Sequence, residues 1–344
     1  MIYIRTDANE VIGAGHVMRC LSIADALRNA GKKICFITSE SNTKILVEQR
    51  GFPSIVLDSS WNQLEQEIPL IRQLLKITGT QEQAVLVDSY FVTEAYMTEL
   101  GQLAKVIYID DLCAGHLTCD LLINYSLYAQ DMPYSQFYTD TKLLLGCRYV
   151  PLRDSFWHIE PKKTAGRADD ILVLTGGSDT VHFALNFVKA VLEKQRQCLT
   201  GRRFHIVCGF YNPDRLKIEK LCQNADNLVL YQNISNLREI MCRADIAVSA
   251  GGFTLYELCA CGIPVITYAS ADNQMNNIQK FSASGLMQYS GDARRADYSY
   301  PELLEKIEAL SADLVQRQQV SYKMQQIVDG GGAGRIAEIV LECV

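Results

Sequence analysis

The sequence predicts an α/β protein built from two units, each with a mostly parallel β-sheet covered by helices. Short segments rich in Val, Ile and Leu alternate with longer segments of helical periodicity along the whole chain. The apolar segments are continuous, which is typical of strands that are buried on both faces. A polar segment, 160–170, interrupts this order, and the same order restarts after it. We therefore expect two Rossmann-like domains, 1–158 and 159–344, with a last helix able to pack back on the first domain.

In the first half, each expected strand is a short, mostly apolar run. These strands are expected at 2–5, 33–38, 54–57, 84–88, 105–110, 120–124 and 142–146. Between them apolar residues recur at helical spacing, and Gly51 supplies a stop for the second helix. The helices are expected at 16–30, 43–50, 61–77 and 93–104.

The second half repeats this order, with buried strands that lead through Gly-rich or polar turns into helices. Strands are expected at 171–174, 203–207, 227–230, 246–248 and 264–268. Helices are expected at 181–197, 214–223, 237–242, 254–261, 273–284, 301–310, 313–328 and 335–343.

The composition argues against a nucleic-acid or membrane partner. Of the 344 residues 48% are hydrophobic, and the formal net charge of −6 gives no bulk attraction for phosphate backbones. No apolar run approaches the roughly 20 residues that span a bilayer, and no signal peptide is evident. Twelve scattered cysteines without a Cys-x-x-Cys pair suit a reducing compartment. We expect a cytoplasmic monomer without membrane insertion.

The N-terminal turn carries the first candidate site. Gly13 and Gly15 follow the first strand, and His16 lies in the first turn of the next helix. Open α/β sheets bind ligands at this edge, where helix N-termini present free N–H groups. A histidine there can exchange protons near neutral pH. The alternative is a tight turn in which His16 only caps or packs.

The turn after strand 171–174 carries the second candidate site. Gly177 and Ser178 can offer backbone N–H groups to a phosphate, and Asp179 would oppose an anion unless its side chain caps the helix. The alternative is a capped turn without a ligand.

The turn after strand 246–248 is the most specific of the motifs. The amides of Gly251, Gly252 and Phe253 can hold a diphosphate, and Glu257 can accept hydrogen bonds from ribose hydroxyls. The alternative is a capping box, in which Thr254 caps the helix and Glu257 is its partner.

The segment 272–277 follows the next strand at the same edge. Asn273 and Gln274 offer donors and acceptors without charge, which suits a sugar. The alternative is a solvated helix cap.

The third and fourth motifs together resemble the donor site of GT-B proteins, the fold of the peptidoglycan glycosyltransferase MurG. Further motifs make the chain similar to the PseG family of UDP-sugar hydrolases in pseudaminic acid biosynthesis. These motifs are Arg5-x-Asp7, Gly13-Ala-Gly-His16-Val-Met-Arg19, Val87-Asp88-Ser-Tyr90, Ile109-Asp110-Asp111, Gly146-Cys-Arg-Tyr149-Val-Pro-Leu-Arg153, Gly176-Gly177-Ser178-Asp179 and Asp329-Gly-x-Gly-Ala-x-Arg335. They cover nearly the whole chain.

This resemblance implies hydrolysis of UDP-2,4-diacetamido-2,4,6-trideoxy-β-L-altropyranose to UDP and the free sugar, in a cleft between two domains. It implies His16 as the general base for the attacking water and Tyr90 as a group that places the water or the sugar. It further implies substrate contacts from both halves of the chain. The residues so implied are Arg5, Asp7, Gly13, Gly15, Gly177, Ser178, Ile234, Gly251, Gly252, Phe253, Thr254, Glu257, Asn273 and Gln274.

No metal and no cofactor are expected. The five histidines are dispersed, and no His-x-x-x-His pair occurs. Two other functions stay open at this point. One is an inverting UDP-sugar glycosyltransferase, which needs an acceptor alcohol, and the other is a nucleotide-sugar-binding module without turnover.

Overall fold

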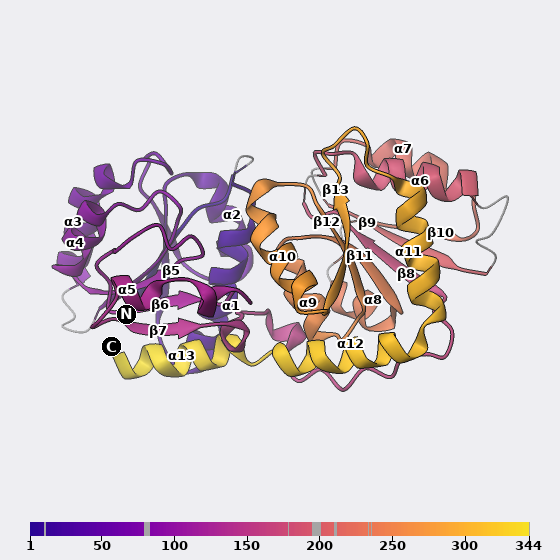
Figure 1. The fold of residues 1–344 in the computed structure, drawn as a ribbon. Helices are drawn as coiled ribbons and strands as arrows, with labels where there is room; N and C mark the ends of the chain where they lie inside the picture. The colour runs from indigo at the N-terminus through magenta and orange to yellow at the C-terminus, as the bar shows by residue number, and fades with distance from the viewer. Residues whose placement is uncertain are drawn as a thin grey trace. The chain divides into compact units, whose positions relative to one another are not determined.

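The structure is a computed structural model that describes residues 1–9, 12–78, 83–177, 179–194, 201–209, 212–232, 234 and 236–343. The chain forms two compact units (Figure 1). Unit 1 comprises Met1–Trp157 and Gly330–Val344, and unit 2 comprises His158–Asp329.

Unit 1 is built around a seven-stranded parallel sheet in the order β3-β2-β1-β4-β5-β6-β7. Its strands are β1 (Ile2–Thr6), β2 (Ile34–Thr38), β3 (Ser54–Val56), β4 (Ala84–Asp88), β5 (Lys105–Ile109), β6 (Leu121–Asn124) and β7 (Lys142–Leu145). Its helices are α1 (Gly15–Asn29), α2 (Ser41–Gln49), α3 (Ile68–Thr78), α4 (Glu94–Gly101), α5 (Tyr134–Phe137) and α13 (Gly332–Cys343). β1 and β4 are buried along their whole lengths, as their continuous apolar sequences predict.

The last helix of the chain belongs to unit 1. α13, at the yellow end of the chain in Figure 1, contacts α1. Gly332 and Gly330 permit this return, because a Cβ on Gly332 would lie 2.2 Å from the Val150 carbonyl oxygen and one on Gly330 would lie 2.3 Å from that of Phe156.

Unit 2 has a six-stranded parallel sheet in the order β10-β9-β8-β11-β12-β13. Its strands are β8 (Asp170–Leu174), β9 (Arg203–Cys208), β10 (Leu228–Gln232), β11 (Ile246–Ala250), β12 (Val265–Ala269) and β13 (Met287–Asp292). Its helices are α6 (Phe183–Lys194), α7 (Arg215–Cys222), α8 (Leu237–Arg243), α9 (Thr254–Ala260), α10 (Met275–Ala283), α11 (Tyr300–Ala312) and α12 (Leu314–Ile327). One core cluster joins α6 and α11 to the strands of this sheet.

One expected helix differs in the structure, and two elements, α5 and β13, were not expected. The helix expected at 61–77 is a 3-10 turn, Leu64–Glu67, followed by α3, whose first turn contains Pro69. Proline fits a first helical turn because its missing N–H has no partner there. β13 was not expected, since its sequence is polar and contains Gly291, and it pairs only with β12. The expected helix at 181–197 is α6, and its end beyond 194 lies outside the described residues.

Candidate active site

Three neighbouring strands of unit 1 end in acidic residues at one edge of the sheet. Asp88 is the last residue of β4, Asp7 follows β1, and Asp111 lies two residues beyond β5. β1, β4 and β5 are adjacent and parallel, so their carboxyl ends share one edge. α1 begins at the same edge, and His16 is its second residue. This is the edge at which open α/β sheets bind ligands.

His16 forms a close pair with Asp88. Its Nδ1 lies 2.6 Å from Asp88 Oδ1, and both side chains are buried. Burial alone would raise the pKa of Asp88, but the charges of Arg19 and His16 outweigh it and hold that pKa well below its usual range. The carboxylate can only accept, so His16 Nδ1 carries the hydrogen and donates it. This leaves the Nε2 lone pair of a neutral His16 available to accept a proton.

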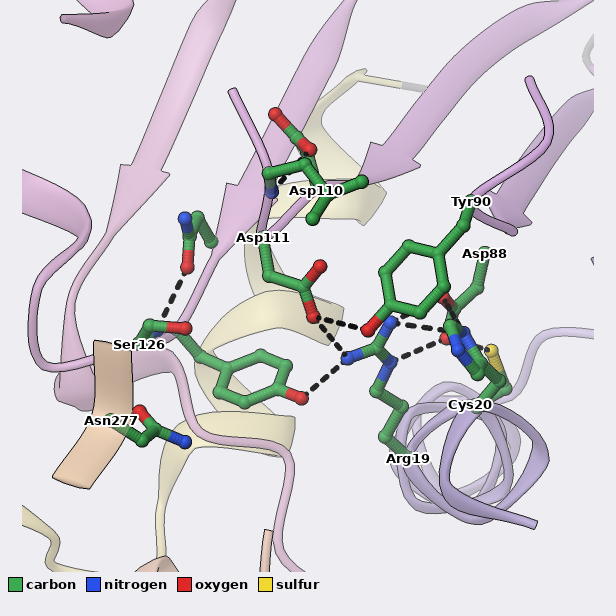
Figure 2. Close-up of polar contacts among 12 residues, drawn as sticks. Arg19, Cys20, Asp88, Tyr90, Asp110, Asp111, Ser126 and Asn277 are labelled. Carbon is green, nitrogen blue, oxygen red and sulfur yellow. Dashed lines mark hydrogen bonds and ion pairs between the residues drawn. The ribbon is translucent and has the colours of Figure 1, made fainter. Parts of the chain in front are cut away.

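Tyr90 lies against His16. The two rings meet edge to face with centroids 4.6 Å apart, and the Tyr90 hydroxyl donates to Asp111 Oδ2 at 3.1 Å (Figure 2). Burial and the nearby Asp111 raise the pKa of the Tyr90 hydroxyl, so it stays a neutral phenol. Tyr90 therefore contributes a hydroxyl and an aromatic face, and no charge.

A small pocket opens beside His16 within unit 1. Its lining residues are Asp7, Ile12, His16, Trp61, Asp88, Ser89, Tyr90 and Phe91. Trp61 and Phe91 meet edge to face with centroids 4.9 Å apart. The pocket thus places aromatic side chains beside a proton acceptor, and it is small.

Asp7 and the two glycines before His16 lie near the start of α1, and the carboxylate of Asp7 is buried and already accepts from Arg5 and Ser39. Asp7 lines the pocket, and its Oδ1 accepts hydrogen bonds from the Ser39 backbone N–H and hydroxyl at 2.8 Å. Gly13 adopts a φ of 71°, which favours glycine, and both Gly13 and Gly15 are exposed. α1 begins after Ala14 without a side-chain cap.

The expectation that Arg5 binds substrate is wrong. Arg5 is 0% exposed, and its guanidinium donates to both carboxylate oxygens of Glu67, at 2.7 and 2.6 Å, and to Asp7. A group enclosed in this way cannot reach a ligand. Arg5 instead neutralises two buried carboxylates beneath the pocket.

Arg5→Met is expected to destabilise the protein strongly, by about 3–5 kcal/mol, because it leaves Glu67 buried without its partner. Urea unfolding followed by far-UV circular dichroism measures the effect. Arg295→Met is the control, since the exposed pair of Arg295 with Asp297 should contribute nothing measurable. Equal unfolding midpoints for the two variants would contradict this role of Arg5.

The turn between β8 and α6 forms the first candidate site of unit 2. Gly177 is exposed, and Ser178 lies outside the described residues. Asp179 caps α6, because its carboxylate accepts from the backbone N–H groups of Phe183 at 2.8 Å and Ala184 at 3.0 Å. The expected conflict between Asp179 and an anion is therefore reduced by its use as a cap.

The turn between β11 and α9 forms the second candidate site of unit 2. Gly251 packs closely under α10, because a Cβ there would lie 2.4 Å from Ile278 Cγ1, whereas a Cβ on Gly252 would meet nothing within 4 Å. The capping-box alternative is wrong: Phe253 caps α9 without a side-chain bond, and Thr254 is the first helical residue. Glu257 lies one turn into α9 and is 6% exposed.

The remaining expected contacts come from two loops of unit 2. Ile234 is half-buried after β10, and Asn273 is exposed in the 3-10 turn after β12. Gln274 Oε1 accepts from the Ser270 backbone N–H at 2.9 Å. The amide nitrogen of Gln274 donates to the Ser270 hydroxyl at 3.1 Å, so both ends of the side-chain amide order this turn and one of its two hydrogens is used there.

Three residues around His16 belong to the motifs shared with the PseG family, but the sequence alone assigned them no role. They are Asp88, Arg19 and Asp111, and all three contact one another or His16. The signal for Asp88 and Asp111 was an acid at or just after a strand end, which places them at the ligand-binding edge. Their mutual contacts required the fold.

Within the described ranges, no group of three or more His, Cys, Asp or Glu side chains could hold a metal ion. In that same part of the chain, no helix has the length and apolar character needed to cross a membrane.

Known proteins resemble the chain in sequence and in fold. Residues 171–329 match the family model described as the glycosyltransferase family 28 C-terminal domain. The chain is 26% identical over 280 residues to the uncharacterized protein MJ1062 of Methanocaldococcus jannaschii, covering 77% of this chain and 54% of that protein. It therefore spans about half the length of that relative.

A second relative is the UDP-2,4-diacetamido-2,4,6-trideoxy-beta-L-altropyranose hydrolase of Campylobacter jejuni. It is 22% identical over 243 residues, covering 70% of this chain and 81% of that protein. Among solved structures, MurG of Acinetobacter baumannii superposes with a TM-score of 0.71 at 13% identity, covering 99% of both chains. The fold is GT-B, with two Rossmann-like domains, as expected from the sequence.

Proposed function

We propose that this protein hydrolyses a UDP-linked diacetamido-trideoxy sugar, UDP-2,4-diacetamido-2,4,6-trideoxy-β-L-altropyranose, to UDP and the free sugar. The observation that carries the proposal is the His16–Asp88 pair at 2.6 Å beside an aromatic-walled pocket. A neutral histidine whose Nδ1–H is held by a carboxylate is suited to take a proton from water. The similarity to the Campylobacter jejuni hydrolase supports the same reaction.

In the proposed reaction, His16 Nε2 removes a proton from a water molecule while the water oxygen attacks the anomeric carbon. The bond from that carbon to the β-phosphate oxygen of UDP breaks, and its electron pair leaves with UDP. The sugar is released with inversion at the anomeric carbon. A well-placed general base of this kind contributes roughly 10²–10⁴-fold to the rate. Asp88 stabilises the imidazolium that forms, and Tyr90 places the water or the sugar.

Unit 2 is proposed to bind the UDP part of the substrate. The backbone N–H groups of Gly251–Phe253 and Gly177–Ser178 would hold the diphosphate and stabilise the charge that develops on it. Glu257 would accept from the ribose hydroxyls, Ile234 would contact uracil, and Asn273 and Gln274 would contact the sugar. The match of residues 171–329 to a glycosyltransferase domain supports a nucleotide-sugar ligand.

A second candidate function is transfer of the same sugar to an alcohol. Two observations favour it: the family 28 domain match and the MurG-like fold. The chemistry at His16 would be unchanged, because an acceptor hydroxyl would lose its proton to the same nitrogen. Hydrolysis and transfer therefore differ only in the nucleophile.

The decisive experiment is NMR of the protein with this UDP-sugar, without an acceptor and without added metal. We expect prompt appearance of UDP and free sugar, with the inverted anomer first. UDP release that begins only when an acceptor is added, with a new glycoside, would instead establish the transferase. UDP binding without any product in either assay would leave a binding module and refute both.

A further inference from the structure

Arg19 lies one turn after His16 on α1 and is 5% exposed. Its Nε donates to Asp88 Oδ2 at 2.6 Å, and its NH2 donates to Asp88 Oδ1 at 2.5 Å. This two-point contact holds the carboxylate that in turn accepts from His16. The Arg19 guanidinium thereby determines where the Nδ1–H of His16 points.

The remaining nitrogen of Arg19 contacts the Tyr90 side of the site. NH1 donates to Tyr125 Oη at 2.6 Å and to Asp111 Oδ2 at 3.2 Å, and this same oxygen accepts from the Tyr90 hydroxyl (Figure 2). The two carboxylates come from the ends of neighbouring strands, β4 and β5. Arg19 is thus shared by both candidate catalytic side chains.

We propose that Arg19 is a positioning residue that holds His16 through Asp88 and Tyr90 through Asp111, and that it favours the neutral form of His16. The proposal rests on the hydrolase function above for its kinetic part. Asp88 and Tyr90 line the pocket, and Arg19 lies behind them. Arg19 therefore acts on the reaction through these partners.

The charges around His16 explain the second part of the proposal. Arg19 NH2 lies 3.1 Å from His16 Nδ1, and both groups contact the Asp88 carboxylate. A positive imidazolium would therefore be repelled by the guanidinium, which disfavours the charged form of His16. The groups that face this cluster are the carboxyl groups of Asp88, Asp111 and Asp7, the Arg19 guanidinium, and the uncharged Cys20, Tyr90 and Tyr125. Burial alone would lower the pKa of Arg19, but Asp88 outweighs it and raises that pKa, so the cation persists. Removing Arg19 would leave Asp88 to stabilise the imidazolium alone.

Titration of the His16 imidazole by NMR in the ligand-free protein tests the electrostatic part without any substrate. In Arg19→Met the titration midpoint should move to higher pH, because a cation 3.1 Å from the ring nitrogen is lost. Arg19→Lys keeps the charge, so its midpoint should stay close to that of the unchanged protein. His16→Gln assigns the signal, and Arg19→Gln, which also removes the cation, is the second variant if Arg19→Met does not fold.

Turnover of the UDP-sugar tests the positioning part. In Arg19→Met, kcat should fall by roughly 10–100-fold with KM within about twofold, since a group that touches no substrate acts on the catalytic step. The acidic limb of the kcat/KM profile should move to higher pH with the titration midpoint. Arg317→Lys is the control: Arg317 is 0% exposed in unit 2 and contacts the backbone carbonyls of Ala165 and Gly166. Arg317→Lys should lower stability but leave the His16 titration midpoint and kcat unchanged.

A folded Arg19→Met protein with an unchanged His16 midpoint overturns the proposal, whatever its activity. So does a fall in kcat/KM caused by KM alone. If the unchanged protein releases no UDP, the hydrolase function fails, but the titration of ligand-free His16 still decides whether Arg19 favours the neutral ring.

Discussion

Replacing His16 with asparagine is expected to remove most UDP release and to leave UDP binding intact. The substitution deletes the Nε2 acceptor, which should cost about 10²–10⁴-fold in kcat. UDP affinity should stay within about twofold, because the proposed UDP contacts all come from unit 2 and make no use of the general base. UDP release from the UDP-sugar and calorimetric titration with UDP measure the two quantities.

His205→Asn is the matched control for this substitution. His205 also pairs with a carboxylate, Asp170 Oδ1 at 2.8 Å. Asp170 is the first residue of β8, whereas the proposed phosphate contacts of this strand lie in the turn after its last residue. The control should keep full turnover. Full activity in His16→Asn would remove His16 from the reaction, and equal losses in both variants would point to damage to the fold.

Replacing Asp88 with asparagine should lower turnover, as replacing His16 does. Asp88→Asn keeps the size of the side chain, but an amide can donate to Nδ1 and so favour the tautomer whose Nε2 carries the hydrogen. It also removes the negative charge that binds Arg19. Because the pKa of Asp88 is lowered in the folded protein, its stabilising effect is complete at neutral pH and is lost only as the pH falls through that lowered value.

The strands were the most predictable part of the fold. β4 was expected at 84–88 and is found there, since Val-Leu-Val between a small residue and an acid has no helical period. β13 was missed because an edge strand with polar residues carries no apolar run. The start of α3 was placed too early, at residue 61, because Leu64 and Ile68 fit helical spacing although Leu64 belongs to a separate 3-10 turn.

The sequence predicted the residues of the candidate site only where they lie close together along the chain. Gly13, Gly15 and His16 are neighbours in sequence, so a turn motif identifies them together. The partner of His16 is 72 residues away, and the partner of Arg5 is 62 residues away. No local pattern distinguishes a buried arginine that neutralises Glu67 from one that binds a phosphate. Contacts of this kind follow from strand order, which the sequence pattern does not specify.

The turn of unit 2 that we propose to hold the diphosphate, Gly176–Gly177, offers the second large effect, at a residue that none of the motifs contains. Gly209 follows β9, and a Cβ there would lie 2.3 Å from the carbonyl oxygens of both Gly176 and Gly177. Backbone atoms cannot rotate away as a side chain can, so Gly209→Ala must displace the Gly176–Gly177 turn. Each charge-assisted hydrogen bond lost from a diphosphate costs about 1.5–3 kcal/mol. The Kd for UDP should therefore rise by roughly 10–100-fold.

Gly166→Ala provides the comparison for this variant. Gly166 lies in the same unit, and a Cβ there meets nothing within 4 Å. The UDP affinity and the thermal midpoint of Gly166→Ala should be unchanged. Gly209→Ala should bind UDP more weakly while its circular dichroism spectrum shows that it is still folded. Normal UDP binding by a folded Gly209→Ala protein would show that the Gly176–Gly177 turn does not hold the diphosphate. The proposed contacts would then reduce to Gly251–Phe253, and a further loss on Gly251→Ala, where Ile278 blocks the added carbon, would identify that turn as the anion site.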